Sequence, residues 1–126
     1  MTGGDTFFFL DSRVEGGHLW VVISDPEGYP QDDVVIVNLT TDQAWKDRSC
    51  VLHPGEHPYI KHQTLVYYRE TARVPPERMA VLESGHLRMD AKIAPRVLAR
   101  IRMGAAASIF TPTGCVDVLR TQGLVR

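Results

Sequence analysis

Three short runs of apolar, β-branched and aromatic residues dominate the first third of the chain. They are residues 6–10 (TFFFL), 18–24 (HLWVVIS) and 34–41 (VVIVNLTT). The segments between them, residues 11–17 and 25–33, are polar and contain glycine or proline, as turns and loops do. Because such runs favour strands and no helical period separates them, the pattern predicts an antiparallel sheet or a small barrel.

More β-patterned segments follow in the middle of the chain. Residues 49–52 are short enough for an edge strand. Residues 64–68 (TLVYY) predict a strand that continues, bent or bulged, through the more polar residues 69–74. The two prolines at 75 and 76 end this strand, because proline fixes φ and lacks a backbone N–H. Residues 79–82 predict a further short strand or turn.

The pattern becomes helical toward the C-terminus. Apolar residues recur at helical spacing from Val97 to Ala105, which predicts a helix starting at Ala94 or Pro95 and ending near Ser108. A second short helix is expected after Pro112, with Gly123 as its stop signal. Strands first and helices last indicate an α+β fold. We expect a single domain over residues 1–126, with a β-barrel over about 4–83 and a helical part over about 94–123.

Composition agrees with an ordinary soluble globular domain. The chain has 126 residues, of which 44% are hydrophobic and 23% are charged. No apolar run approaches the roughly 20 residues needed to span a bilayer, and the N-terminus lacks a secretory signal pattern. We therefore expect a cytoplasmic protein without membrane contact. In that compartment Cys50 and Cys115 are expected to be reduced thiols.

Charge is unevenly distributed along the chain although the net charge is only −1. The part ending at Tyr68 contains 4 Lys or Arg against 10 Asp or Glu, whereas the part starting at Arg69 contains 10 against 5. Most of the basic residues in the second part are arginines, whose forked donors suit phosphate recognition. The same arginines could equally line the solvated faces of helices.

The segment from Cys50 to Tyr68 carries a cluster of chemically versatile side chains. His53, His57 and His62 fall within ten residues, among prolines and a glycine, so residues 53–62 predict an exposed loop joining two strands. Histidine can transfer protons near neutral pH, contact phosphate or bind a metal. Together with Cys50 the three histidines supply four zinc ligands, but their spacing departs from the paired doublets of most zinc sites.

The order of motifs resembles that of the MazF/PemK toxins. The motifs are Gly4-Asp5 at the first strand, the run 18–24 as the second strand, the run 34–41 as the third, and an amphipathic C-terminal helix. The resemblance implies an SH3-like β-barrel that is generally dimeric, pairs with a cognate antitoxin protein, and cleaves single-stranded RNA without a metal or other cofactor. The family pairs a basic residue at the start of the second strand with a hydroxyl at the end of the third.

In this sequence the resemblance places that pair at His18 and at Thr40 or Thr41. His18 stands where the family has arginine, and Leu19 stands where it has proline. Cleavage through the 2′-hydroxyl of RNA needs a base, an acid and donors to the phosphate. Histidines can fill both proton-transfer roles, so we expect His18 to act with one of the loop histidines, His57 foremost.

The remaining candidates would bind the RNA. His53, His62 and Arg69 are expected to contact phosphate, and Tyr67 or Tyr68 to stack on an unpaired base. The two tyrosines are neighbours on a strand and must point to opposite faces, so one of them belongs to the core. An exposed Trp45 would favour a binding surface. The sequence also permits a non-catalytic module on the same fold that binds a protein or a nucleic acid.

Overall fold

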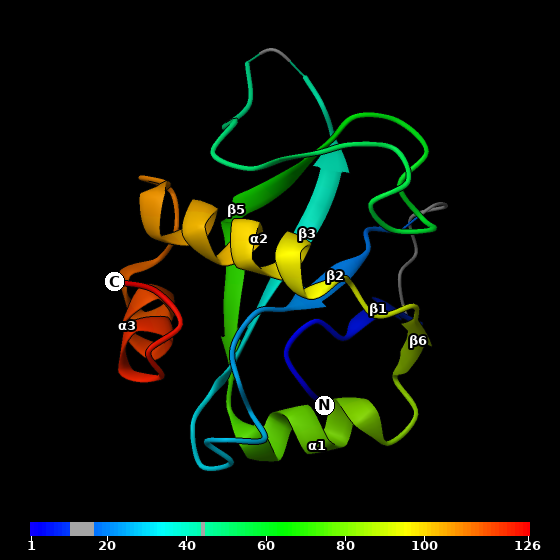
Figure 1. Cartoon of the computed structure of the whole chain (residues 1–126). Coiled ribbons are helices and arrows are strands. Elements are labelled where there is room, and N and C mark those ends of the chain that lie inside the picture. Colours follow the sequence, from blue (N-terminus) through cyan, green and yellow to red (C-terminus); the bar gives the residue numbers. More distant parts are fainter. Residues whose placement is uncertain (11–16, 44) are drawn as a thin grey trace.

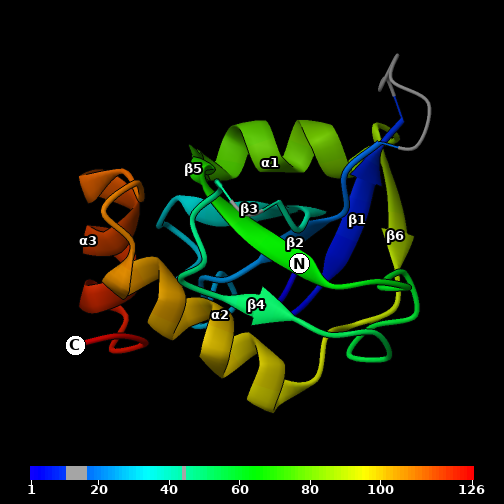
Figure 2. The same cartoon turned by 90° about the horizontal axis from the view of Figure 1, so that it is seen from above.

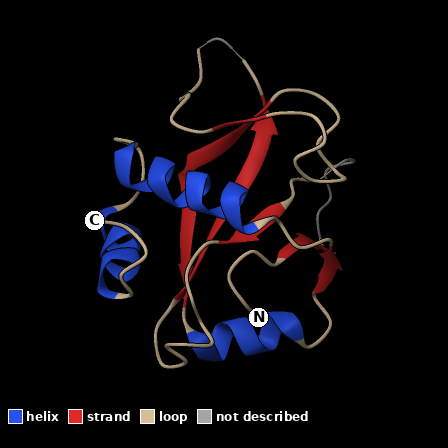
Figure 3. Cartoon of the chain, viewed as in Figure 1, coloured by secondary structure: helices blue, strands red, loops and turns tan. Residues whose placement is uncertain are grey.

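The computed structural model describes residues 1–10, 17–43 and 45–126. In these residues the chain forms a sheet that lies between helices (Figures 1 and 3). Its strands and helices follow one another as β1 (Thr6–Phe9), β2 (Trp20–Val22), β3 (Val34–Thr41), β4 (Val51–Leu52), β5 (Thr64–Val74), α1 (Pro76–Glu83), β6 (Leu87–Asp90), α2 (Pro95–Ala107) and α3 (Thr113–Thr121). Strands precede the two C-terminal helices, which confirms the α+β prediction.

The six strands that the structure describes form one antiparallel sheet in the order β4-β5-β3-β2-β1-β6. β3 and β5 are its longest strands, and a register shift between Ile36 and Asn38 marks the irregularity expected in β5. β4 and β6 are the two edge strands of the sheet, and among the described residues they do not pair with each other. The expectation of a closed barrel is therefore wrong.

The sheet is open, and helices cover both of its faces. Figure 2 shows α1 on one side of the sheet and α2 on the other. One apolar cluster joins β2, β3 and β5 to α2 and α3, and a second joins the opposite sheet face to Met79 of α1. A sheet buried on both faces has near-continuous apolar strands, which explains why Val34 to Val37 are all buried.

Two elements differ from the sequence prediction. Residues 79–82, expected to form a strand or turn, belong to α1, where Pro76 occupies the first turn and its fixed φ suits a helix start. β6 is absent from the sequence prediction, because its four residues (LRMD) show only a weak alternation of apolar and polar side chains. In the structure the two middle residues are exposed. β6 forms because it pairs with all four residues of β1. The predicted helix near 95–108 and the second helix ending before Gly123 are confirmed.

The larger core cluster fixes α2 against the sheet. Tyr68 of β5 is completely buried, and its hydroxyl donates to the carbonyl oxygen of Ile101 over 2.6 Å. Burial raises the pKa of Tyr68 far above its ordinary value, so the phenol stays neutral. Cys50 and Cys115 are buried free thiols, in agreement with the expected reduced state. Burial also raises the pKa of both thiols, which disfavours reactive thiolates.

Candidate functional site

A concave pocket of about 330 Å³ lies where β2 and β3 meet the loop between β4 and β5. Eight residues line it: His18, Leu39, Thr40, Thr41, Tyr59, Lys61, His62 and Thr64. We call it the histidine pocket. It brings together four of the residues singled out in the sequence, His18, Thr40, Thr41 and His62, from segments up to 44 positions apart.

Strand register explains why His18 and Thr40 meet. Trp20 of β2 lies opposite Asn38 of β3, and extending this antiparallel register by two residues places His18 opposite Thr40. The side chain of His18 is exposed, and its Nδ1 lies 2.9 Å from the carbonyl oxygen of Leu39. Because a carbonyl only accepts, Nδ1 carries the proton and Nε2 of the neutral ring keeps its lone pair. The ring thus has the form that a general base needs.

Basic side chains surround the two threonine hydroxyls of the histidine pocket. The Oγ1 of Thr41 lies 3.3 Å from Nε2 of His62, and the Nζ of Lys46 donates to Oγ1 of Thr40 over 2.8 Å. Lys46 itself lies outside the lining, which contains the ammonium group of Lys61. Hydroxyl, imidazolium and ammonium groups all donate hydrogen bonds to phosphate oxygens. The histidine pocket is therefore a candidate site for a phosphodiester group.

Two of the loop histidines lie outside the histidine pocket. His57 is only 2% exposed, and its Nδ1 accepts from the backbone N–H of Tyr59 over 3.0 Å. Its Nε2 lies 2.5 Å from the carbonyl oxygen of Ala91. Both ring nitrogens of His57 are thus bonded inside the protein, so the prediction of an exposed loop over residues 53–62 is wrong at this residue. His53 is exposed but does not line the pocket.

The alternative zinc site is not assembled. All four of its residues, Cys50, His53, His57 and His62, belong to the described ranges, and no group of three or more His, Cys, Asp or Glu in those ranges could hold a metal ion. Cys50 packs against α2, His57 is bonded to the segment before α2, and His62 lines the histidine pocket. The four residues are close in the sequence but separated in the fold.

Glu56 holds the histidine-bearing loop against α2. One carboxylate oxygen accepts from the backbone N–H of His53 over 2.8 Å, and the other is paired with the guanidinium of Arg100. Arg100 also donates to the carbonyl oxygen of Val51 over 2.6 Å. Partial burial raises the pKa of Glu56, but the bonds from Arg100 and His53 outweigh it and hold the pKa below the ordinary 4.5.

We expect the contribution of Glu56 to stability to depend on pH. A carboxyl group whose pKa is lowered by folding stabilises the protein above its ordinary pKa, and this contribution is lost as the pH falls through the lowered value. Glu56→Gln should therefore be less stable near neutral pH, by under about 1 kcal/mol because Arg100 is partly solvated. Urea denaturation at neutral and at acidic pH measures the difference, which should vanish at acidic pH. Glu77→Gln, on an exposed position of α1, serves as the control. A difference that persists unchanged at acidic pH would contradict the expectation.

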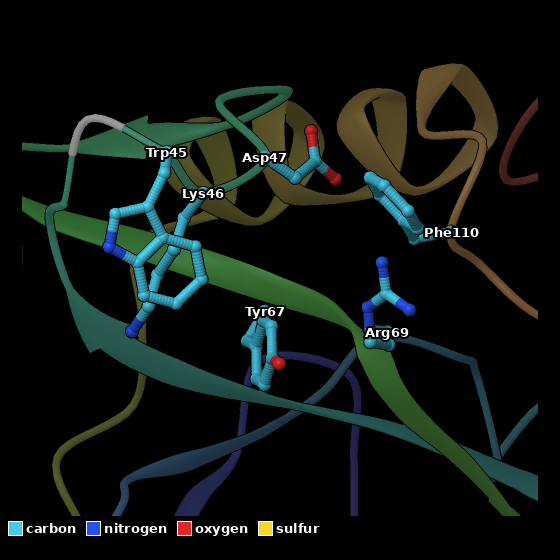
Figure 4. A pocket seen from close by; sticks show the side chains of 6 residues that line it. All are labelled: Trp45, Lys46, Asp47, Tyr67, Arg69 and Phe110. Atoms are coloured by element: carbon cyan, nitrogen blue, oxygen red, sulfur yellow. The ribbon is translucent and has the colours of Figure 1, made fainter.

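A second pocket, which we call the aromatic pocket, lies beside the first. It is about 90 Å³ in volume and is lined by Trp45, Lys46, Asp47, Tyr67, Arg69 and Phe110 (Figure 4). Three of its six residues are aromatic and two are basic. Trp45 is 77% exposed, so the condition that favours a binding surface is met. Arg69, predicted to contact phosphate, lies here rather than in the histidine pocket.

The structure also separates the two predicted tyrosines. Tyr68 lies in the core beneath α2, where it cannot reach a ligand. Tyr67 is half-buried and lines the aromatic pocket. Of the two, Tyr67 is therefore the side chain available for stacking on a base.

Sequence reasoning missed several residues of the two pockets. Lys61, Tyr59 and Thr64 lie next to predicted residues in the chain, and the polar loop around them was a usable signal. Lys46 reaches Thr40 from a loop with no recognisable pattern. Phe110 belongs to the segment after α2. This segment lies near β5 only because α2 packs against the sheet.

No protein-family model matches the chain, and none of the curated proteins matches it. In the part of the chain that the structure describes, the helices are too short or too polar to cross a membrane.

Proposed function

We propose that this protein is a toxin-like RNA-binding protein that acts as a metal-independent endoribonuclease. The observation that carries the proposal is the histidine pocket, where the exposed ring of His18 lies with the hydroxyls of Thr40 and Thr41 and with a second histidine, His62. The resemblance of the strand motifs to the MazF/PemK toxins supports the same function. As in that family, a homodimer, a cognate antitoxin protein and a cytoplasmic location belong to the proposal.

In this reaction the 2′-hydroxyl of the RNA is the nucleophile. His18 accepts the hydroxyl proton at Nε2 while the 2′-oxygen forms a bond to phosphorus. The bond between phosphorus and the 5′-oxygen breaks, and protonated His62 gives a proton to that oxygen. The products are a 2′,3′-cyclic phosphate and a free 5′-hydroxyl, with all atoms accounted for.

The other residues of the pocket stabilise charge on the phosphate. Lys61 supplies an ammonium group, and the threonine hydroxyls donate to non-bridging oxygens as charge develops there. Lys46, bonded to Thr40, fixes that hydroxyl and adds positive charge beside it. His57 has no role in this step, since its nitrogens are bonded to Tyr59 and Ala91.

Incubation of the purified protein with single-stranded RNA in the presence of a chelator tests the proposal. We expect cleavage products that end in a 2′,3′-cyclic phosphate and a 5′-hydroxyl, identified by mass spectrometry. Duplex RNA and single-stranded DNA are the control substrates, because DNA lacks the nucleophile. Intact RNA after incubation, or cleavage of DNA at the same rate, would refute the proposed reaction.

A second candidate function is a non-catalytic module that binds RNA on the same surface. The aromatic pocket favours it, because exposed rings and cations bind nucleic acid without any chemical step. RNA that binds tightly and stays intact would support this candidate over the endoribonuclease.

A further inference from the structure

The aromatic pocket places each of its cations over a ring. The Nζ of Lys46 lies 5.3 Å from the ring centroid of Trp45 and 5.6 Å from that of Tyr67. The guanidinium carbon of Arg69 lies 4.2 Å from the centroid of Phe110. Figure 4 shows the rings of Trp45 and Tyr67 on one side of the pocket and Arg69 with Phe110 on the other. Two groups of rings and cations therefore line the same pocket.

Lys46 connects this surface to the histidine pocket. Its ammonium group contacts the hydroxyl of Thr40 at 2.8 Å while it lies near both Trp45 and Tyr67. Thr40 lines the histidine pocket, and Lys46 lines the aromatic pocket. A phosphate beside Lys46 would thus lie between the two pockets.

We propose that the aromatic pocket binds one unpaired nucleotide of the RNA, next to the phosphate held in the histidine pocket. The base stacks on Trp45, with Tyr67 as the second ring, and the phosphate of that nucleotide pairs with Lys46. This proposal rests on the proposed function, because it takes RNA as the ligand. It adds a base-binding site and assigns Trp45 as a residue that positions the RNA strand.

The chemistry of the pocket selects such a ligand. Its rings already carry cations on their faces, so the complementary ligand is an anion with a flat aromatic group. A nucleotide has both parts. A pocket of about 90 Å³ is too small to enclose a base, whereas Trp45 offers a broad exposed ring to stack on. A paired base is covered by its neighbours in the duplex, so an unpaired one fits.

Asp47 limits where the phosphate can lie. Its carboxylate oxygens accept from the hydroxyl groups of Ser49, over 2.6 Å, and Ser108, over 2.5 Å. Since this carboxylate repels a phosphate, the nucleotide is oriented with its phosphate at Lys46 and away from Asp47. That direction leads the strand toward Thr40 and His18.

Binding of a labelled 2′-O-methyl oligouridylate tests the proposal, because this RNA lacks the nucleophile and cannot be cut. Trp45→Ala should weaken its binding by roughly 5- to 150-fold, the range found for loss of base–aromatic stacking. Trp45→Phe keeps a ring and should retain most of the affinity. Tyr29→Ala removes an exposed ring outside both pockets and should bind as the unaltered protein does. Fluorescence anisotropy measures all four proteins.

An oligomer of the same backbone without bases separates stacking from phosphate contacts. The unaltered protein should bind it more weakly than the oligouridylate, and Trp45→Ala should weaken its binding no further. Equal affinities of the unaltered protein and Trp45→Ala for the oligouridylate, an equal loss for both oligomers, or no binding by the unaltered protein would each overturn the proposal. If the protein cuts no RNA but its binding depends on the bases and on Trp45, the nuclease activity is refuted and the base-binding site stands. If Trp45→Ala cuts RNA normally and binds it with unchanged affinity, the base-binding site is refuted and the nuclease activity stands.

Discussion

His18→Ala is expected to slow RNA cleavage by roughly 10²- to 10⁴-fold, the usual contribution of a general base. The reason lies in the bond between Nδ1 of His18 and the carbonyl oxygen of Leu39. This bond fixes the proton on Nδ1, so Nε2 is free to accept the proton of the 2′-hydroxyl. Alanine leaves no group in that position, while the threonines and lysines that hold the phosphate remain. Single-turnover cleavage of a labelled single-stranded RNA measures the loss.

Binding of non-cleavable RNA distinguishes the loss of a base from a general disturbance of the pocket. His18→Ala should change the affinity for this RNA little, because the threonines and lysines that hold the phosphate remain. His53→Ala is the matched control, because His53 is an exposed histidine of the same region outside the histidine pocket. Undiminished cleavage by His18→Ala would remove the base from the mechanism.

The convergence of His18 and Thr40 follows from features that the sequence displays. Two β-patterned runs joined by a loop predict an antiparallel pair, and such a pair brings the start of one strand beside the end of the other. The histidine ahead of β2 and the threonines at the end of β3 therefore meet at one edge. His62 joins them because it lies two residues before Thr64, the first residue of β5, which pairs with Thr41 at the end of β3.

Other parts of the site depend on packing that no local pattern encodes. His57 looks equivalent to His53 and His62 in the sequence, but its burial depends on the segment around Ala91, 34 positions away. Phe110 enters the aromatic pocket only because α2 crosses the sheet and ends near Arg69. The sequence pattern is limited in the same way for the fold as a whole. Apolar strands predict that a sheet forms. Whether the sheet closes into a barrel depends on the pairing of its edge strands and on where the helices pack, which the local pattern does not predict.

The position of α2 depends on one glycine, and Gly104→Ala is expected to destabilise the protein. A Cβ atom at this position would lie 2.2 Å from the hydroxyl oxygen of Tyr68 and 2.9 Å from the Cβ of Cys50. Both neighbours are buried and cannot move aside freely. Alanine usually favours a helix over glycine by roughly 1 kcal/mol, but overpacking of a core costs about 1–3 kcal/mol. Both contacts are shorter than van der Waals separation, so the cost of overpacking should exceed the gain in helix propensity. The measured result should be a lower urea midpoint.

Gly114→Ala in α3 is the matched control. A Cβ there would meet the guanidinium end of Arg73 at 2.9 Å, and a flexible, partly exposed side chain can swing away. Its stability should stay level or rise slightly, as the helix propensity of alanine predicts. Adding Tyr68→Phe to Gly104→Ala removes the closest clash and should restore part of the lost stability. A Gly104→Ala protein as stable as Gly114→Ala would contradict the close approach of α2 to β5.

The same substitution tests how α2 supports the RNA surface. Ser108, directly after α2, donates to Asp47, and Phe110 packs on Arg69, so a displaced helix moves both walls of the aromatic pocket. The histidine pocket is held by β2, β3 and the loop before β5, which α2 contacts through Arg100 and Glu56. We therefore expect Gly104→Ala, at temperatures where it stays folded, to weaken binding of a base-containing oligomer more than binding of an abasic one. Equal losses for both oligomers would show that the helix supports the phosphate contacts and not the base-binding site.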